Sequence, residues 1–160
     1  MPKFALDPID YRILDQLQRN ARISNVDLAD AVGLSPSPCA RRVRLLERAG
    51  IIKGSATLVD AASVGLPISV FVQVRLEKQA EPVLQVFEKT VAEYPELMEC
   101  YLMTGDADYL LRVVVPDLDS FQRFLMDRLT HVPGVASIRS SFALRQVQYR
   151  TALPLSLIHI

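Results

Sequence analysis

The sequence contains no tryptophan, and only two cysteines and two histidines occur among its 160 residues. Cys39 and Cys100 lie far apart without CxxC spacing, which argues against a disulfide or a metal site, so we expect two buried free thiols. His131 lies near a proline turn and His159 lies in the C-terminal tail. No serine lies in a GxSxG motif or beside a candidate base. We therefore expect no enzyme, no metal and no cofactor.

Long apolar runs and an excess of one charge are also missing. Eighteen Lys and Arg residues balance eighteen Asp and Glu residues. No apolar run approaches the roughly 20 residues that a membrane-spanning helix needs, and the N-terminus lacks the apolar segment of a signal peptide. We therefore expect a cytoplasmic globular protein that does not associate with membranes.

The neutral total hides an uneven distribution of charge. Residues 1–60 carry nine Lys and Arg against seven Asp and Glu, whereas the remainder carries nine against eleven. Between Arg41 and Lys53 there are five cations and one anion, Glu47. A nucleic-acid partner is therefore expected to bind the first part of the chain.

Three helices are predicted in this first part. Asp7, followed by Pro8 and Asp10, resembles a helix start, and apolar residues at helical spacing continue to about Arg19. Ser24 and Asp27 resemble a capping box that opens a short second helix. A third helix is expected over about residues 35–50, with Ser35 as its cap and a glycine closing its end. Two short helices joined around a glycine, the second one cationic, predict a helix-turn-helix.

The third predicted helix has two distinct faces. Cys39, Val43 and Leu46 share one face, and a row of arginines lies opposite. Such a row is often only a solvated surface, but five cations beside one anion in a neutral chain weaken that interpretation. Arginine forks suit phosphates and guanine edges. The residues predicted to contact double-stranded DNA are Ser35, Ser37, Arg41, Arg42, Arg44, Arg48 and Lys53.

The rest of the chain predicts a second domain. Residues 51–59 hold two β-prone pieces around a glycine, which would form a wing, and residues 60–67 are turn-prone and are expected to be a hinge. Residues 68–76 alternate with period two, as in a strand. Beyond them, the patterns indicate a helix, a hairpin of two strands, a further helix and a last strand. The order βαββαβ predicts an α+β, ferredoxin-like fold with both helices on one face of an antiparallel sheet.

The other face of this sheet is predicted to be an association surface. Val113, Val115 and the side of the first strand that carries Phe71 suggest that this face is too apolar for water. We therefore expect a homodimer, which would also place two helix-turn-helix units on adjacent half-sites.

Three stretches resemble the Lrp/AsnC (feast/famine) transcriptional regulators: DPIDYRILDQLQRNARIS, VGLSPSPCARRVRLLERAGII and TGDADYLLRVVVPDLDSF. The resemblance covers residues 6–155. It implies a winged helix-turn-helix DNA-binding domain over residues 1–60 and an effector-binding and oligomerisation domain over residues 68–155, with assembly as far as octamers. Residues 156–160 depart from the family's usual ending and are expected to be a tail, either natural or vector-derived.

The hairpin turn is the predicted effector site. Aspartates in such turns often only supply hydrogen bonds to the backbone, but a glycine also lets amides approach a small carboxylate while an acidic side chain binds its ammonium. The resemblance favours the second role, because it implies an amino-acid effector near this hairpin at a subunit interface, with the partner's strand around residues 137–141 completing the pocket. The predicted effector-binding residues are Thr104, Gly105, Asp106 and Asp108.

Together these observations predict a sequence-specific transcriptional regulator whose DNA binding or assembly responds to a small amino acid. One alternative is an architectural protein that organises DNA without an effector. A second alternative, a small ferredoxin-like enzyme with an appended binding module, is disfavoured because no paired base and nucleophile is present.

Overall fold

The computed structural model describes residues 4–158, which form two compact units. One unit runs to Thr57 and also contains the segment from Val147 onward, and the other spans Leu58–Gln146. The sequence-based division placed residues 68–155 in one domain, so the structure differs at the C-terminal end. There the side-chain amide of Gln18 accepts from the backbone N–H of Leu153 at 2.6 Å and donates to its carbonyl at 3.2 Å. These contacts hold the C-terminal segment in the first unit.

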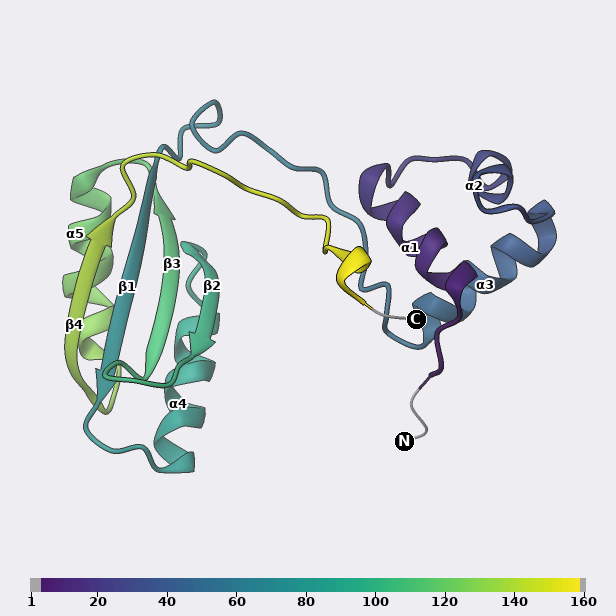
Figure 1. The fold of residues 1–160 in the computed structure, drawn as a ribbon. Coiled ribbons are helices and arrows are strands. Elements are labelled where there is room, and N and C mark those ends of the chain that lie inside the picture. The colour runs from purple at the N-terminus through teal and green to yellow at the C-terminus, as the bar shows by residue number, and fades with distance from the viewer. Residues whose placement is uncertain (1–3, 159–160) are drawn as a thin grey trace. The chain divides into compact units, whose positions relative to one another are not determined.

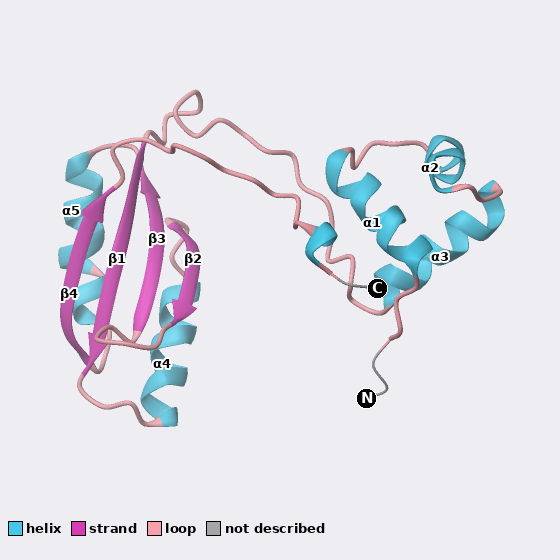
Figure 2. Ribbon diagram, in the orientation of Figure 1, coloured by secondary structure: helices cyan, strands magenta, loops and turns pink. Residues whose placement is uncertain are grey.

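The first unit is built from three helices, α1 (Pro8–Arg19), α2 (Asn25–Val32) and α3 (Pro36–Arg48), shown in Figure 2. Their predicted starts are confirmed for α1 and α2. Asp7 and Asp10 cap α1 reciprocally, and the Ser24 hydroxyl accepts from the N–H of Asp27. Ser35 occupies the predicted cap position of α3, but its side chain makes no capping hydrogen bond. The predicted helix-turn-helix is therefore present.

A small apolar core holds these helices together. Ile13, Val32, Cys39 and Leu46 are almost completely inaccessible to solvent, and they come from all three helices. Val43 packs against this cluster, as predicted for the inward face of α3. Burying these side chains is the main apolar contribution to the stability of the unit.

The two strands predicted between residues 51 and 59 do not form. The backbone N–H groups of Ile51 and Ile52 both donate to the carbonyl of Leu46, at 3.0 and 3.2 Å. The first β-prone piece therefore closes the C-terminus of α3, with Gly50 in the left-handed conformation at φ +75°. The residues from Lys53 to Val59 belong to no strand.

The second unit is a four-stranded antiparallel sheet with two helices on one face (Figure 1). The strands lie in the order β2-β3-β1-β4, which is the ferredoxin-like arrangement expected from the βαββαβ order. The elements are β1 (Ile68–Leu76), α4 (Glu81–Ala92), β2 (Leu97–Leu102), β3 (Tyr109–Val115), α5 (Leu118–Asp127) and β4 (Val135–Phe142).

The core of this unit lies between the sheet and its helices. Val70, Val72 and Val74 of β1 pair in register with Val113, Leu111 and Tyr109 of β3, and all six are 0% exposed. The helices contribute aromatic side chains to the same cluster. Val113 and Val115 therefore face the helices, and the prediction that they form part of the free face is wrong. Strand alternation places them on the same side as the buried valines of β1.

The free face of the sheet is mixed rather than uniformly apolar. Phe71 is 40% exposed and lies opposite Arg112, and Tyr101 is 51% exposed. The Arg112 guanidinium donates to Glu99 at 2.7 Å, and the Tyr101 hydroxyl donates to the same carboxylate at 2.9 Å. These contacts, led by the one from Arg112, lower the pKa of Glu99. Leu110 and Val114 also face this side, because they alternate with the buried residues of β3.

Two further predictions can be compared with the structure. Cys39 is buried as expected, but Cys100 is exposed, so the prediction of two buried thiols is wrong for Cys100. The predicted tail can be followed only to Ile158, because residues 159–160 lie outside the described part of the chain.

None of the helices described in the structure is both long and apolar enough to cross a membrane.

Candidate nucleic-acid interface and ligand site

The outward arc of α3 carries the predicted DNA contacts. Ser37, Arg41, Arg44 and Arg48 are all exposed, whereas Cys39 and Leu46 on the opposite side are 0% exposed. Within residues 4–158, Arg41, Arg44 and Arg48 have no hydrogen-bond or ion-pair partner for their side chains. Their guanidinium groups are therefore available to a phosphate or a base edge.

The other predicted contacts flank this arc. Ser35 precedes the first turn of α3, and Lys53 follows the end of the same helix. Both are exposed. They lie at opposite ends of α3, where a polar side chain can contact the backbone of a duplex on either side of a groove.

Asn25 connects the two helices of the helix-turn-helix, although the sequence analysis did not single it out. Its side-chain amide donates to the carbonyl of Pro36 at 2.8 Å and so joins the first turn of α2 to the first turn of α3. In a helix-turn-helix, the N-terminal residues of the second helix, here α3, point toward the nucleic acid. An asparagine directly after the capping Ser24 was the available signal, but its partner lies 11 residues away and could not be identified from spacing.

Arg42 is placed differently from its neighbours. Its Nη1 atom lies 2.6 Å from Asp7 Oδ2 and 3.1 Å from Asp10 Oδ1, so the side chain is bound to the start of α1. The prediction that Arg42 contacts DNA is therefore not supported by its position. Successive helical residues are rotated by about 100°, and that step carries Arg42 away from the arc of Arg41 and Arg44.

The predicted effector residues lie in the turn between β2 and β3. Thr104, Gly105 and Asp106 are exposed. Gly105 has φ +103°, and no atom would lie within 4 Å of an added Cβ, so backbone conformation rather than space requires a glycine. The turn is open to a ligand or a partner on this side.

Asp108 differs from these three residues because its side chain is buried and bonded within the chain. It is 4% exposed, and its carboxylate accepts from the backbone N–H of Leu76 at 2.7 Å and from the side chain of Gln79 at 2.6 Å. Both carboxylate oxygens are thus engaged within the chain. This carboxylate links the end of β1 to the start of β3. Its position therefore does not support the prediction that Asp108 contacts an effector.

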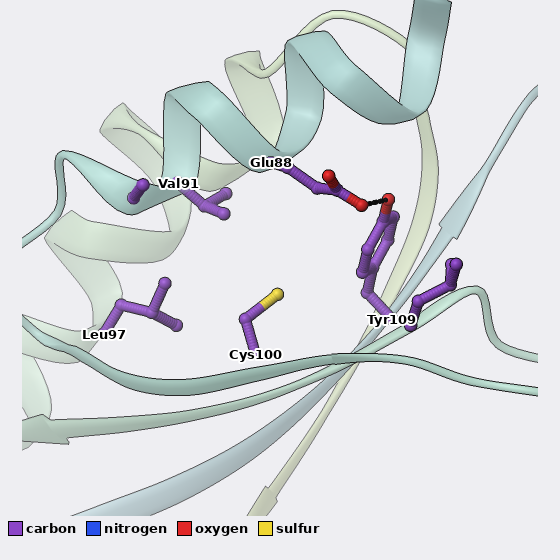
Figure 3. A pocket seen from close by; sticks show the side chains of 7 residues that line it. Glu88, Val91, Leu97, Cys100 and Tyr109 are labelled. Atoms are coloured by element: carbon purple, nitrogen blue, oxygen red, sulfur yellow. Dashed lines mark hydrogen bonds between the residues drawn. The ribbon is translucent and has the colours of Figure 1, made fainter. Parts of the chain in front are cut away.

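A cavity of about 220 Å3 lies between α4 and the edge of the sheet (Figure 3). Val91, Leu97 and Cys100 line it, and the Tyr109 hydroxyl donates to Glu88 at 2.7 Å beside it. Desolvation, and then the charge of Glu88, raises the pKa of Cys100 to about 11, so this thiol stays protonated at neutral pH. The cavity includes none of the predicted effector residues and is smaller than the roughly 300 Å3 of a typical ligand site.

Comparison with known protein families identifies both units. The "Winged helix-turn-helix DNA-binding" model matches residues 6–53, and the "Lrp/AsnC ligand binding domain" model matches residues 69–153. The chain belongs to the Lrp/AsnC family of transcriptional regulators. These family models confirm the predicted fold class, a winged helix-turn-helix followed by a ferredoxin-like domain, although residues 51–59 of this chain form no strands. The prediction that the protein is not an enzyme is also confirmed, because the relatives of this Lrp/AsnC protein are regulators.

Individual relatives cover nearly the whole chain. The "Bkd operon transcriptional regulator" of Pseudomonas aeruginosa is 49% identical over 150 residues, which cover 94% of this chain and 98% of that protein. The "Leucine-responsive regulatory protein" of Escherichia coli K12 is 40% identical, covering 92% of this chain and 90% of that protein.

Solved structures of Lrp/AsnC-type regulators are similar too. A transcriptional regulator of Neisseria meningitidis in complex with L-Met has a TM-score of 0.88 and 40% identity, covering 94% of this chain and 97% of that chain. An AsnC family transcriptional regulator of Agrobacterium tumefaciens has a TM-score of 0.87 and 38% identity, covering 94% and 98%. All predicted DNA-contacting and effector-binding residues of this Lrp/AsnC protein fall within the two matched ranges.

Proposed function

We propose that this Lrp/AsnC regulator binds specific sequences of double-stranded DNA through α3 and that a small amino acid modulates its DNA binding or its assembly. Ser35, Ser37, Arg41, Arg44, Arg48 and Lys53 make the DNA contacts. The observation that carries this proposal is the exposed arc of arginines on the third helix of a helix-turn-helix, opposite a buried face. Because its target is DNA, we place the protein in the cytoplasm.

The proposed effector site is the exposed turn of Thr104, Gly105 and Asp106. The backbone N–H groups beside Gly105 can bind a carboxylate, and the Asp106 carboxylate can bind an ammonium group. A zwitterion needs both, since a buried charge without a partner is costly. The L-Met complex of the Neisseria meningitidis regulator supports an amino acid as the ligand. Because the turn is exposed in a single chain, a second chain would have to close the pocket.

We further propose a homodimer that assembles through the free face of the sheet, with higher assemblies such as an octamer. Phe71 and Tyr101 leave apolar surface exposed there, and Leu110 and Val114 extend it. A dimer would carry two copies of α3, which is what two half-sites about one helical turn apart require.

DNA titrations with and without amino acids test the proposed function. Binding sites would first be selected from a pool of randomised duplexes, and the twenty amino acids would be screened by thermal shift, because a bound ligand stabilises the folded protein by mass action. We expect one enriched sequence class and a shift of its binding curve with the best amino acid. Equal affinity for selected and random duplexes, with no response to any amino acid, would instead indicate an architectural DNA-binding protein.

A further inference from the structure

Two consecutive arginines of α3 have opposite surroundings. Arg41 is exposed and has no ion-pair partner among the described residues, whereas the side chain of Arg42 is only 28% exposed and contacts two aspartates of α1. The two residues have the same side chain and adjoin in the sequence. Their difference therefore comes from position on the helix alone.

Each of the four carboxylate oxygens of Asp7 and Asp10 accepts a hydrogen bond. Asp7 Oδ1 accepts from the N–H of Asp10 at 2.8 Å, and Asp10 Oδ2 accepts from the N–H of Asp7 at 3.1 Å. The remaining oxygen of each carboxylate, Asp7 Oδ2 and Asp10 Oδ1, accepts from Arg42 Nη1. Arg42 therefore completes the capping box of α1 from a different helix. We call this group of Asp7, Asp10 and Arg42 the α1–α3 clamp.

The clamp limits how α3 can rotate about its own axis. The inward face of α3 is narrow: Cys39 and Leu46 are its only residues that are completely buried among those described. Apolar contacts are not directional, so a narrow apolar face tolerates small rotations of a helix. Hydrogen bonds between charged groups do have a preferred direction, and Asp10, with 8% of its side chain exposed, is held by its own helix.

We propose that Arg42 is a positioning residue for DNA binding: through the α1–α3 clamp it sets which arc of α3 faces the duplex, without touching DNA itself. The proposal rests on the proposed function, because the arc to be positioned is that of Arg41, Arg44 and Arg48. Loss of the clamp lets α3 rotate and disperses these three guanidinium groups. Affinity then falls although every DNA-contacting side chain is still present.

The geometry also predicts which substitution of Arg42 should preserve the clamp. Arg42 reaches both aspartates through one nitrogen atom, Nη1, rather than by the paired contacts of a guanidinium fork. Lysine is a poor substitute where a fork is used, but its ammonium group is a single cation with three donors. Lysine can therefore serve both carboxylates, whereas glutamine lacks the charge.

The test compares full-length Arg42→Gln and Arg42→Lys with Arg41→Gln, the matched control from the exposed arc. DNA titrations over a range of salt concentrations separate the two roles, because losing a phosphate contact lowers the salt slope by about one. Arg41→Gln should lower the slope by about one. Arg42→Gln should weaken binding about three- to tenfold with the slope unchanged, the size of effect expected for coupled neighbours. Arg42→Lys should restore affinity to within about twofold.

Two further measurements test whether the variants are folded and whether Asp10 and Arg42 act together. Circular dichroism would confirm the helical content of each variant at the temperature of the titrations. Asp10→Asn combined with Arg42→Gln would then show whether the two residues act together, since the double variant should bind little worse than Arg42→Gln alone.

Several results would overturn the positioning role. A salt slope for Arg42→Gln that falls as it does for Arg41→Gln would make Arg42 a DNA contact. Unchanged affinity of a folded Arg42→Gln variant, or failure of lysine to restore binding, would show that the clamp does not orient α3. Unchanged affinity and slope for Arg41→Gln would remove the proposed DNA-binding arc itself, and the positioning role with it.

Discussion

The carboxylate of Asp108 accepts a 2.7 Å hydrogen bond from the backbone N–H of Leu76, 32 positions earlier in the sequence. Leu76 is the last residue of β1, at a point where the pairing register with β4 shifts. The N–H of Asp108 in turn donates to the carbonyl of Val74 at 2.9 Å. The residue thus ties the end of the hairpin turn to β1 through both its backbone and its side chain.

Asp108→Ala should therefore destabilise the protein. The substitution leaves the N–H of Leu76 buried without its acceptor, which typically costs about 1–3 kcal/mol. Urea denaturation measures this change. Asp106→Ala in the same turn is the matched control and should stay within about 0.5 kcal/mol of wild type, because it removes an exposed side chain. Equal stability of both variants would contradict the structural role of Asp108.

Asp106→Ala should reduce the response to an amino-acid effector while leaving basal DNA binding intact. The Asp106 carboxylate is the proposed partner of the effector ammonium, and coupling between two sites is typically about 1–3 kcal/mol. Calorimetry with the best amino acid from the screen, followed by DNA titrations with and without it, measures both properties. If the variant binds the effector as tightly as wild type and its DNA curve shifts equally, Asp106 is only a turn residue.

Phe71→Lys should weaken the proposed dimer. Phe71 lies on the free face of the sheet, opposite Arg112, so a lysine there adds a cation beside an existing one. Light scattering coupled to size-exclusion chromatography measures the assembly state, and DNA affinity should fall with it because the second half-site is no longer bound by the same particle. Val86→Lys is a suitable control, since Val86 is 46% exposed on α4, outside that face. Unchanged assembly in both variants would mean that another surface makes the dimer.

The pKa of Asp7 should rise toward its ordinary value of 3.8 in Arg42→Gln. In the folded protein, the hydrogen bond from Arg42 is the largest cause that lowers this pKa, and the N–H of Asp10 adds to it. A lowered pKa stabilises the folded state above the unfolded value, and this stabilisation is lost as the pH falls below about 3.8 through the folded value. Carboxyl NMR titration of both proteins checks the shift. An identical Asp7 titration would show that the clamp does not form in solution.

Local signals were sufficient to predict most of the elements. Asp7 and Ser24 were recognised as caps because a capping side chain bonds an N–H only three residues away, so its evidence lies within one turn of sequence. The first strand was recognised from the alternation of Val70, Val72 and Val74, since one face of a half-buried strand repeats every second residue. The order of these elements then indicated the ferredoxin-like fold.

Other properties were decided by partners that are distant in the sequence. Arg41 and Arg42 are equivalent by composition, and only the packing of α3 against α1 assigns Arg42 to two aspartates more than 30 positions away. Asp106 and Asp108 are the same residue type in the same predicted turn, but only Asp108 is buried, against the end of β1. In the same way, the segment from Val147 joins the first unit through Gln18, 135 positions before its partner Leu153. The sequence by itself determined most of the elements, because caps and periodicity are local, and three stretches of it indicated the family. Only the tertiary structure decided which of two identical neighbouring side chains is free to bind, because that depends on what each one meets after folding.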